Sequence, residues 1–153
     1  GALAHYCSAL DVEGVAFEAF QTVNGTRLPI YHTNVMMSIG SGFAAICLDC
    51  IDDGEERTMV LETLENDNLE VIALTEEQIG SFAGNMLEVS STLDDTPRIV
   101  MSKAAFEALD QIQIEKISQF GKIISIPLDI IEACGGGSAR CMMAEVHLPN
   151  HKS

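Results

Sequence analysis

The stretch Gly135-Gly-Gly-Ser-Ala-Arg-Cys-Met-Met-Ala-Glu-Val146 places a thiol between three consecutive glycines and an apolar segment. Glycine allows the main chain to adopt positive φ and to approach a ligand closely, so this loop can direct N–H groups toward Cys141. A thiol among such donors is favoured as the thiolate, the form that acts as a nucleophile. The alternative is a glycine-rich turn before a buried core cysteine, and the glycines taken alone favour that alternative.

A polar break followed by an apolar run also occurs twice upstream. The trio His32-Thr-Asn34 precedes one such run, and Asn85 precedes another. His32, Asn85 and Cys141 are 53 and 56 residues apart, and a regular period of this kind indicates stacked or circularly arranged supersecondary units. If the units share an axis, the three breaks face one central site. Units that are not related by symmetry are the alternative.

Periodicity and capping residues predict the other elements, and strands alternate with helices, so we expect an α/β fold. Helices are expected over 2–11 and 52–65, from Thr75, from Ser102 through Leu109 and beyond, and from Pro127 to Ile131. Strands are expected over 15–20, 28–31, 35–39, 43–47, 69–74, 86–89, 98–101, 122–126 and 141–148, with turns at Asn24-Gly25 and over 94–97.

The 153 residues are 47% hydrophobic, which suits one packed domain over 1–153. Eight Lys and Arg oppose 23 Asp and Glu, for a formal net charge of −15. This charge repels a phosphate backbone, so we expect no nucleic-acid partner. It attracts a cationic small molecule, although acidity that serves solubility alone is the simpler explanation of the charge.

The five cysteines are odd in number and follow no spacing typical of secreted domains. We therefore expect free thiols in a reducing cytoplasm. No signal peptide and no apolar run of about 18 residues is recognised, so no membrane-spanning segment is expected. The pair Cys47-x-x-Cys50 lacks the second pair that a zinc site needs, which predicts core or near-surface thiols and no metal.

Four segments carry a resemblance to a known superfamily: Tyr31-His-Thr-Asn-Val-Met-Met37, Phe82-Ala-Gly-Asn-Met-Leu-Glu-Val89, Ile99-Val-Met-Ser-Lys-Ala-Ala105 and 135–146. From about Ala2 to Pro149 the chain resembles the amidinotransferase-like penteins, and most closely their citrulline-utilization hydrolase branch. Dimethylarginine dimethylaminohydrolase and arginine deiminase are more distant relatives. The resemblance implies a pseudo-fivefold fan of ββαβ units. We expect a partial pentein α/β-propeller of about three units, with the N-terminal units absent.

The resemblance also implies a reaction. Cys141 attacks a guanidinium or ureido carbon, and His32 protonates the leaving nitrogen and then activates water. We therefore expect a cysteine hydrolase that acts on a C–N bond of an arginine- or citrulline-like amino acid through an S-linked intermediate, with no cofactor. Amidino transfer and a non-catalytic interaction module are the alternatives. Asn34 stands where related enzymes carry Asp, which favours a neutral ureido group because an amide both donates and accepts hydrogen bonds.

Asn34, Asn85, Gly137 and Ser138 are the candidate substrate-binding residues. Asn85 either lines the site or stabilises a turn, and Ser138 is either an oxyanion donor or a turn residue. The available acids are expected to be solvated or structural: Glu18, Glu88, Glu132 and Glu145. In the related enzymes the N-terminal half supplies the carboxylates that hold the substrate. We therefore expect this chain alone to be impaired in catalysis, and to self-associate or to require the missing half.

Overall fold

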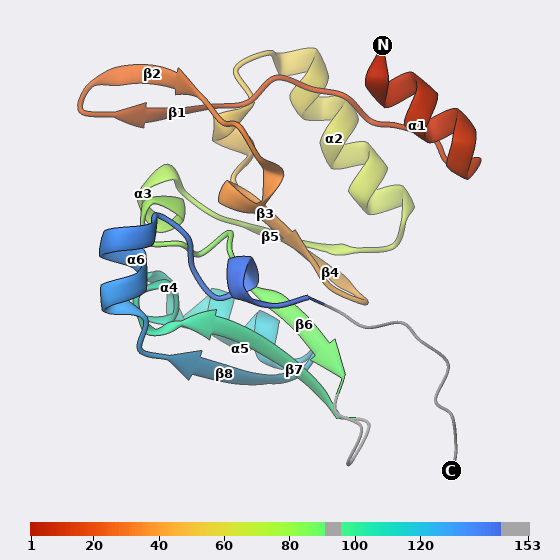
Figure 1. The fold of residues 1–153 in the computed structure, drawn as a ribbon. Helices are drawn as coiled ribbons and strands as arrows, with labels where there is room; N and C mark the ends of the chain where they lie inside the picture. The colour runs from red at the N-terminus through yellow and green to blue at the C-terminus, as the bar shows by residue number, and fades with distance from the viewer. Residues whose placement is uncertain (91–95, 145–153) are drawn as a thin grey trace.

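The computed structural model describes residues 1–90 and 96–144, and two three-stranded sheets organise this part of the chain (Figure 1). The strands of the first sheet are β3 (Met37–Ile39), β4 (Phe43–Ile46) and β5 (Glu70–Ala73). Those of the second sheet are β6 (Leu87–Ser90), β7 (Pro97–Ser102) and β8 (Lys122–Ile126). In both sheets the first two strands pair antiparallel and the last two pair parallel.

A helical crossover completes each unit, because parallel neighbours can be joined only by a long return connection. α2 (Gly54–Asn66) follows β4, whereas α4 (Lys103–Ala108) and α5 (Gln111–Ser118) follow β7. The ββαβ unit therefore occurs twice, which confirms the predicted α/β class and its repeat. Two units are complete in the described residues, which form no closed barrel, and the partial fan of about three units stays a prediction.

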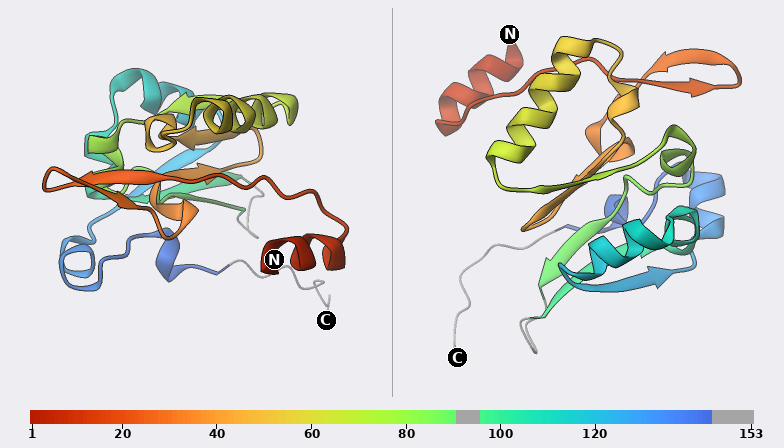
Figure 2. Two further views of the ribbon diagram at one scale, coloured as in Figure 1. Left: turned by 90° about the horizontal axis from the view of Figure 1, so that it is seen from above. Right: turned by 180° about the vertical axis from the view of Figure 1, so that it is seen from behind.

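Shorter elements flank the two units: α1 (Ala2–Leu10), β1 (Phe20–Val23), β2 (Thr26–Pro29), α3 (Glu76–Gly80), α6 (Asp129–Gly135), and the 3-10 turns η1 (Thr33–Val35), η2 (Leu48–Cys50) and η3 (Arg140–Met142). The β1–β2 hairpin turns on Asn24 and Gly25, whose φ angles of 50° and 76° suit a tight two-residue turn, as predicted. The hairpin and α1 lie at opposite ends of the molecule (Figures 1 and 2).

Polar side chains fix the points at which the helices begin. The predicted caps Thr75 and Ser102 are confirmed, and the Ser102 hydroxyl accepts the main-chain N–H of Ala105 at 3.1 Å. The single helix predicted from Ser102 is wrong beyond Ala108. Asp110 caps a second helix there, because its carboxylate accepts the N–H of Gln113 at 2.8 Å and satisfies a free donor of a new first turn.

Two other predictions, those for residues 15–20 and for the helix from Pro127, need correction. Residues 15–19 form no strand: the N–H of Glu18 donates to Glu56 on α2 at 2.7 Å, while Phe17 and Ala19 pack on the core. At the end of this segment the carbonyl of Ala19 accepts the N–H of Ile30 at 2.7 Å, directly before β1 begins. The helix expected from Pro127 begins at Asp129.

The predicted closing strand 141–148 is wrong at its start. Cys141 and Met142 lie in a 3-10 turn, in which the N–H of Cys141 donates to the carbonyl of Ser138 at 3.1 Å. Residues 145–148 of that prediction, which include Glu145, lie outside the described residues. The predicted turn at 94–97 lies partly outside them as well.

One apolar core joins the two units. It contains fully buried side chains from both sheets, such as Phe43 and Ile72 from the first and Ile99 and Met101 from the second. Cys47 and Cys50 are completely buried in it, so the prediction of core thiols is confirmed. The Cys47 sulfur and burial both raise the pKa of the Cys50 thiol. In the described part of the chain, no three His, Cys, Asp or Glu side chains gather as a metal site needs.

Candidate functional site

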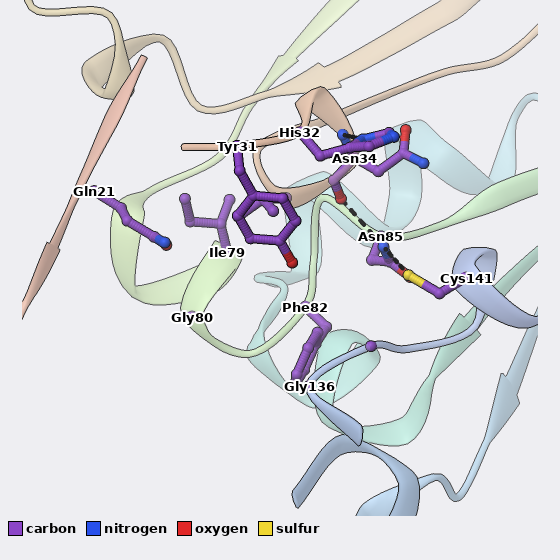
Figure 3. A pocket seen from close by; sticks show the side chains of 12 residues that line it. Gln21, Tyr31, His32, Asn34, Ile79, Gly80, Phe82, Asn85, Gly136 and Cys141 are labelled. Carbon is purple, nitrogen blue, oxygen red and sulfur yellow. Dashed lines mark hydrogen bonds between the residues drawn. The ribbon is translucent and has the colours of Figure 1, made fainter. Parts of the chain in front are cut away.

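A cleft of about 470 Å³ lies where the two units, the hairpin and the glycine-rich loop meet (Figure 3). Its lining includes five of the six residues singled out from the sequence, which come from three distant segments: His32, Asn34, Asn85, Gly137 and Cys141. The remaining candidate, Ser138, is fully buried behind the loop. The polar breaks of the repeat therefore do face a single cleft, as a shared axis of the units predicts.

His32 caps the 3-10 turn η1, and this contact determines which ring nitrogen of the neutral imidazole carries the proton. Its Nδ1 accepts the main-chain N–H of Asn34 at 3.0 Å. A nitrogen that accepts carries no proton, so the proton of the neutral ring is on Nε2.

Asn85 lies between the histidine turn and the cysteine. Its amide Nδ2 is 3.2 Å from the carbonyl oxygen of Asn34 and 3.3 Å from Sγ of Cys141. Its Oδ1 accepts the main-chain N–H of Arg140 at 3.0 Å. Asn85 is only 5% exposed, whereas Cys141 is exposed to the cleft. One buried carboxamide thus contacts both loops that carry the reactive groups.

The glycine-rich loop brings Cys141 to the cleft by close main-chain approach. Gly136 ends α6 in the left-handed region with φ of 65°, which suits glycine. A Cβ on Gly137 would lie 3.2 Å from Cβ and 3.3 Å from Sγ of Cys141, so this position is also constrained by packing. The Ser138 hydroxyl donates to Glu132 at 2.6 Å, and this bond holds the loop on α6.

Of the acids named from the sequence, the three in the described residues do not line the cleft: Glu18, Glu88 and Glu132. Glu88 accepts both the N–H and the hydroxyl of Ser41, at 2.9 and 2.5 Å, and so joins the second sheet to the β3–β4 turn. Glu132 is engaged by Ser138. Among the described lining residues there is no Asp or Glu, so this part of the chain gives the cleft no carboxylate.

Sequence reasoning missed the cluster that fixes the hairpin. Arg27 of β2 pairs with Asp52 and with Glu76 of α3, and Glu76 also accepts the N–H of Thr22 at 2.9 Å. Hydrogen bonds to both carboxylates raise the pKa of Arg27. The bond from Arg27 lowers the pKa of Asp52. Partial burial acts to raise the pKa of Glu76, but its bonds from Thr22 and Arg27 lower it overall.

Other lining residues also went unpredicted as site residues. Gln21 reaches the cleft from β1, and Tyr31, which precedes His32 and is 83% exposed, directs its ring into it (Figure 3). Tyr31 stands at the start of a quoted motif, which is the signal that points to it. No pattern in the sequence singles out Gln21, because its place depends on the hairpin docking on α3.

No helix in residues 1–90 and 96–144 has the length and apolarity that crossing a membrane requires. Three comparisons with known proteins give further information. The family model of eukaryotic N,N dimethylarginine dimethylhydrolase matches residues 1–148. The comparison with curated protein sequences gives no match.

Three solved structures share the fold, and two of them are of ArgZ from cyanobacteria. Apo ArgZ, described as an arginine dihydrolase from the ornithine–ammonia cycle in cyanobacteria, has a TM-score of 0.67 and 18% identity over 97% of this chain and 21% of its own. The N-terminal domain of ArgZ with bound product has a TM-score of 0.60 and 18% identity over 90% of this chain and 44% of its own. AgrE with ornithine and NAD⁺ has a TM-score of 0.56 and 21% identity over 78% and 16%.

This chain thus spans less than half the length of each of these structures, and identities this low establish the fold alone. The family model, by contrast, is a match to a defined family and runs over residues 1–148. The predicted resemblance to the pentein enzymes is confirmed, and the chain belongs to the eukaryotic N,N dimethylarginine dimethylhydrolase family.

Proposed function

We propose that this chain carries the nucleophile and the proton carrier for hydrolysis of a guanidino C–N bond in an arginine-like compound. The observation that supports this most directly is the shared cleft. Cys141 and His32 both line it although they are far apart in sequence. Membership of a dimethylarginine hydrolase family supports the same reaction class. The arginine dihydrolase description of ArgZ agrees with it.

In the proposed reaction, the Cys141 thiolate adds to the guanidino carbon and forms a C–S bond. The C–N bond to the leaving amine breaks as the imidazolium form of His32 donates a proton to that nitrogen. Water then adds to the S-linked carbon and gives a proton to neutral His32. The C–S bond breaks, the thiolate returns, and a ureido product leaves.

The proton step has a structural requirement. The imidazolium form carries protons on both nitrogens, so it forms only after Nδ1 of His32 releases the N–H of Asn34. Substrate binding that shifts η1 would allow this change. In this proposal Asn34 contributes through its main chain as well as through the side-chain amide predicted to contact substrate.

A ureido substrate such as a citrulline-like compound is a second candidate. The lining residues contributed by the described chain are neutral, apart from the imidazole of His32 and the thiol of Cys141. A cleft without carboxylates binds a neutral ureido group more readily than a guanidinium. We therefore expect this chain alone to bind an arginine-like cation weakly, which is the impairment predicted from its sequence.

A reactive amidine tests the proposed function. 2-Chloroacetamidine resembles a guanidinium, and we expect it to label Cys141 at least about tenfold faster than the exposed Cys134, measured by peptide mass spectrometry. Neutral iodoacetamide is the matched reagent, and its preference for Cys141 should be smaller. His32→Ala should reduce the amidine preference. Equal amidine labelling of both thiols would support a non-catalytic interaction module instead.

A further inference from the structure

The carboxamide of Asn85 connects the two loops that carry the reactive groups. Its Nδ2 donates to the carbonyl of Asn34 in the histidine turn and to Sγ of Cys141, at 3.2 and 3.3 Å (Figure 3). Its Oδ1 accepts the N–H of Arg140, the residue before the cysteine, at 3.0 Å. All three contacts are made to the protein, so this geometry assigns Asn85 a role besides the substrate contact predicted from sequence.

The orientation of this amide is fixed by its main-chain partners. An asparagine side chain can be placed with its nitrogen and oxygen exchanged, and neighbours that only donate or only accept decide between the two. The carbonyl of Asn34 only accepts, and the N–H of Arg140 only donates. Nitrogen must therefore face Asn34, and the second proton of Nδ2 is directed at Cys141.

The sulfur of Cys141 can act as an acceptor or as a donor toward this amide. A thiolate accepts the short contact from Nδ2 at 3.3 Å, whereas a thiol donates to Oδ1 over the longer distance of 3.7 Å. Because Asn85 is only 5% exposed, water cannot readily replace its amide. Hydrogen bonds to charged groups are stronger than those to neutral ones, so the contact gains strength when the thiol loses its proton.

We propose that Asn85 is a positioning residue that donates to Sγ of Cys141 and fixes it relative to the His32 turn. This role rests on the proposed function only for the identity of the compound that Cys141 attacks. The contact between Asn85 and the sulfur can therefore be tested without any substrate.

Asn85→Asp tests the role, because it keeps the shape and the acceptor for Arg140 but replaces the N–H donor with a carboxylate oxygen. We expect iodoacetamide to modify Cys141 about tenfold more slowly near pH 7. The exposed Cys134 is the internal reference and should be unchanged. Asn66→Asp, which makes the same charge change at an exposed position of α2, should leave both rates unchanged. An unaltered Cys141 rate in a folded Asn85→Asp chain would overturn the proposal.

A second measurement keeps Asn85 intact, in case the Asp variant does not fold. In the ¹⁵N-labelled chain, the Nδ2 protons of Asn85 should shift as Cys141 ionises, and Cys141→Ser should abolish this pH dependence. Signals that are independent of pH in both chains would refute the contact. The two proposals can fail separately. If the amidine shows no preference for Cys141 while Asn85→Asp still slows its modification, only the proposed function is refuted. If the amidine preference is present while Asn85→Asp has no effect, only the role of Asn85 is refuted.

Discussion

Replacing Gly84 with alanine tests how closely the two ββαβ units approach beside the cleft. A Cβ at this position would lie 2.6 Å from the carbonyl oxygen of Val35, 2.9 Å from the carbonyl carbon of Met36 and 3.0 Å from the nitrogen of Met37. All three atoms belong to the main chain between η1 and β3, so no side-chain rotation relieves the clash. The units must move apart at the point where Asn85 contacts the carbonyl of Asn34.

The expected cost follows from these contacts. Overpacking of a closely packed site destabilises a protein by about 1–3 kcal/mol. Weakening one buried hydrogen bond beside it adds about 1 kcal/mol. We expect Gly84→Ala to lower the free energy of unfolding by about 2–4 kcal/mol, which for a chain of this size lowers Tm by roughly 4–16 °C.

Urea unfolding followed by circular dichroism measures this change, and Gly54→Ala is the matched control. Gly54 is the first residue of α2, and a Cβ there meets no atom within 4 Å. We expect the control to match or slightly exceed the parent chain in stability, since alanine favours helix more than glycine does. If Gly84→Ala unfolds within about 0.5 kcal/mol of this control, the reasoning about close approach is wrong.

Two further predictions concern the hairpin and the cysteine loop. Arg27→Ala removes the partner that lowers the pKa of Asp52 and helps to lower that of Glu76. Carboxyls with lowered pKa stabilise the fold at a pH above their usual pKa and lose that contribution as pH falls through their folded pKa. The Tm difference between parent and variant should therefore be present at neutral pH and shrink as pH falls below the usual carboxyl range of about 4. A difference that is constant with pH would contradict this. Ser138→Ala removes the bond to Glu132 and leaves a buried gap, so we expect a loss of about 1–2 kcal/mol in unfolding free energy and a slower reaction of Cys141 with 2-chloroacetamidine. Unchanged labelling would show that this bond does not hold the loop.

Elements that depend on neighbours in sequence could be predicted well. The strand over 122–126 has the bounds expected from its apolar run, and that over 43–47 differs by one residue. Thr75 and Ser102 cap helices as predicted because a cap needs only donors two or three residues ahead. The Asn24-Gly25 turn is local in the same sense.

Predictions that needed a partner from elsewhere in the chain failed more often. Residues 15–19 have an alternating pattern, but a strand also requires a neighbour, and the N–H of Glu18 is taken by Glu56. Cys141 was expected to start a strand because apolar residues follow it. The carbonyl of Ser138 instead accepts its N–H and closes a turn.

The sequence by itself determined the repeat of polar breaks, because a regular period can be recognised without knowing the fold. It also predicted that Cys141 and His32 face one cleft if the repeated units share an axis. The tertiary structure alone decided which groups surround that pair. The amide of Asn85 reaches the sulfur, Arg27 ties the hairpin to α3, and Ser138 donates to Glu132. Hydrogen bonds of this kind act over about 3 Å, so they depend on how the chain packs and leave no regular pattern along it.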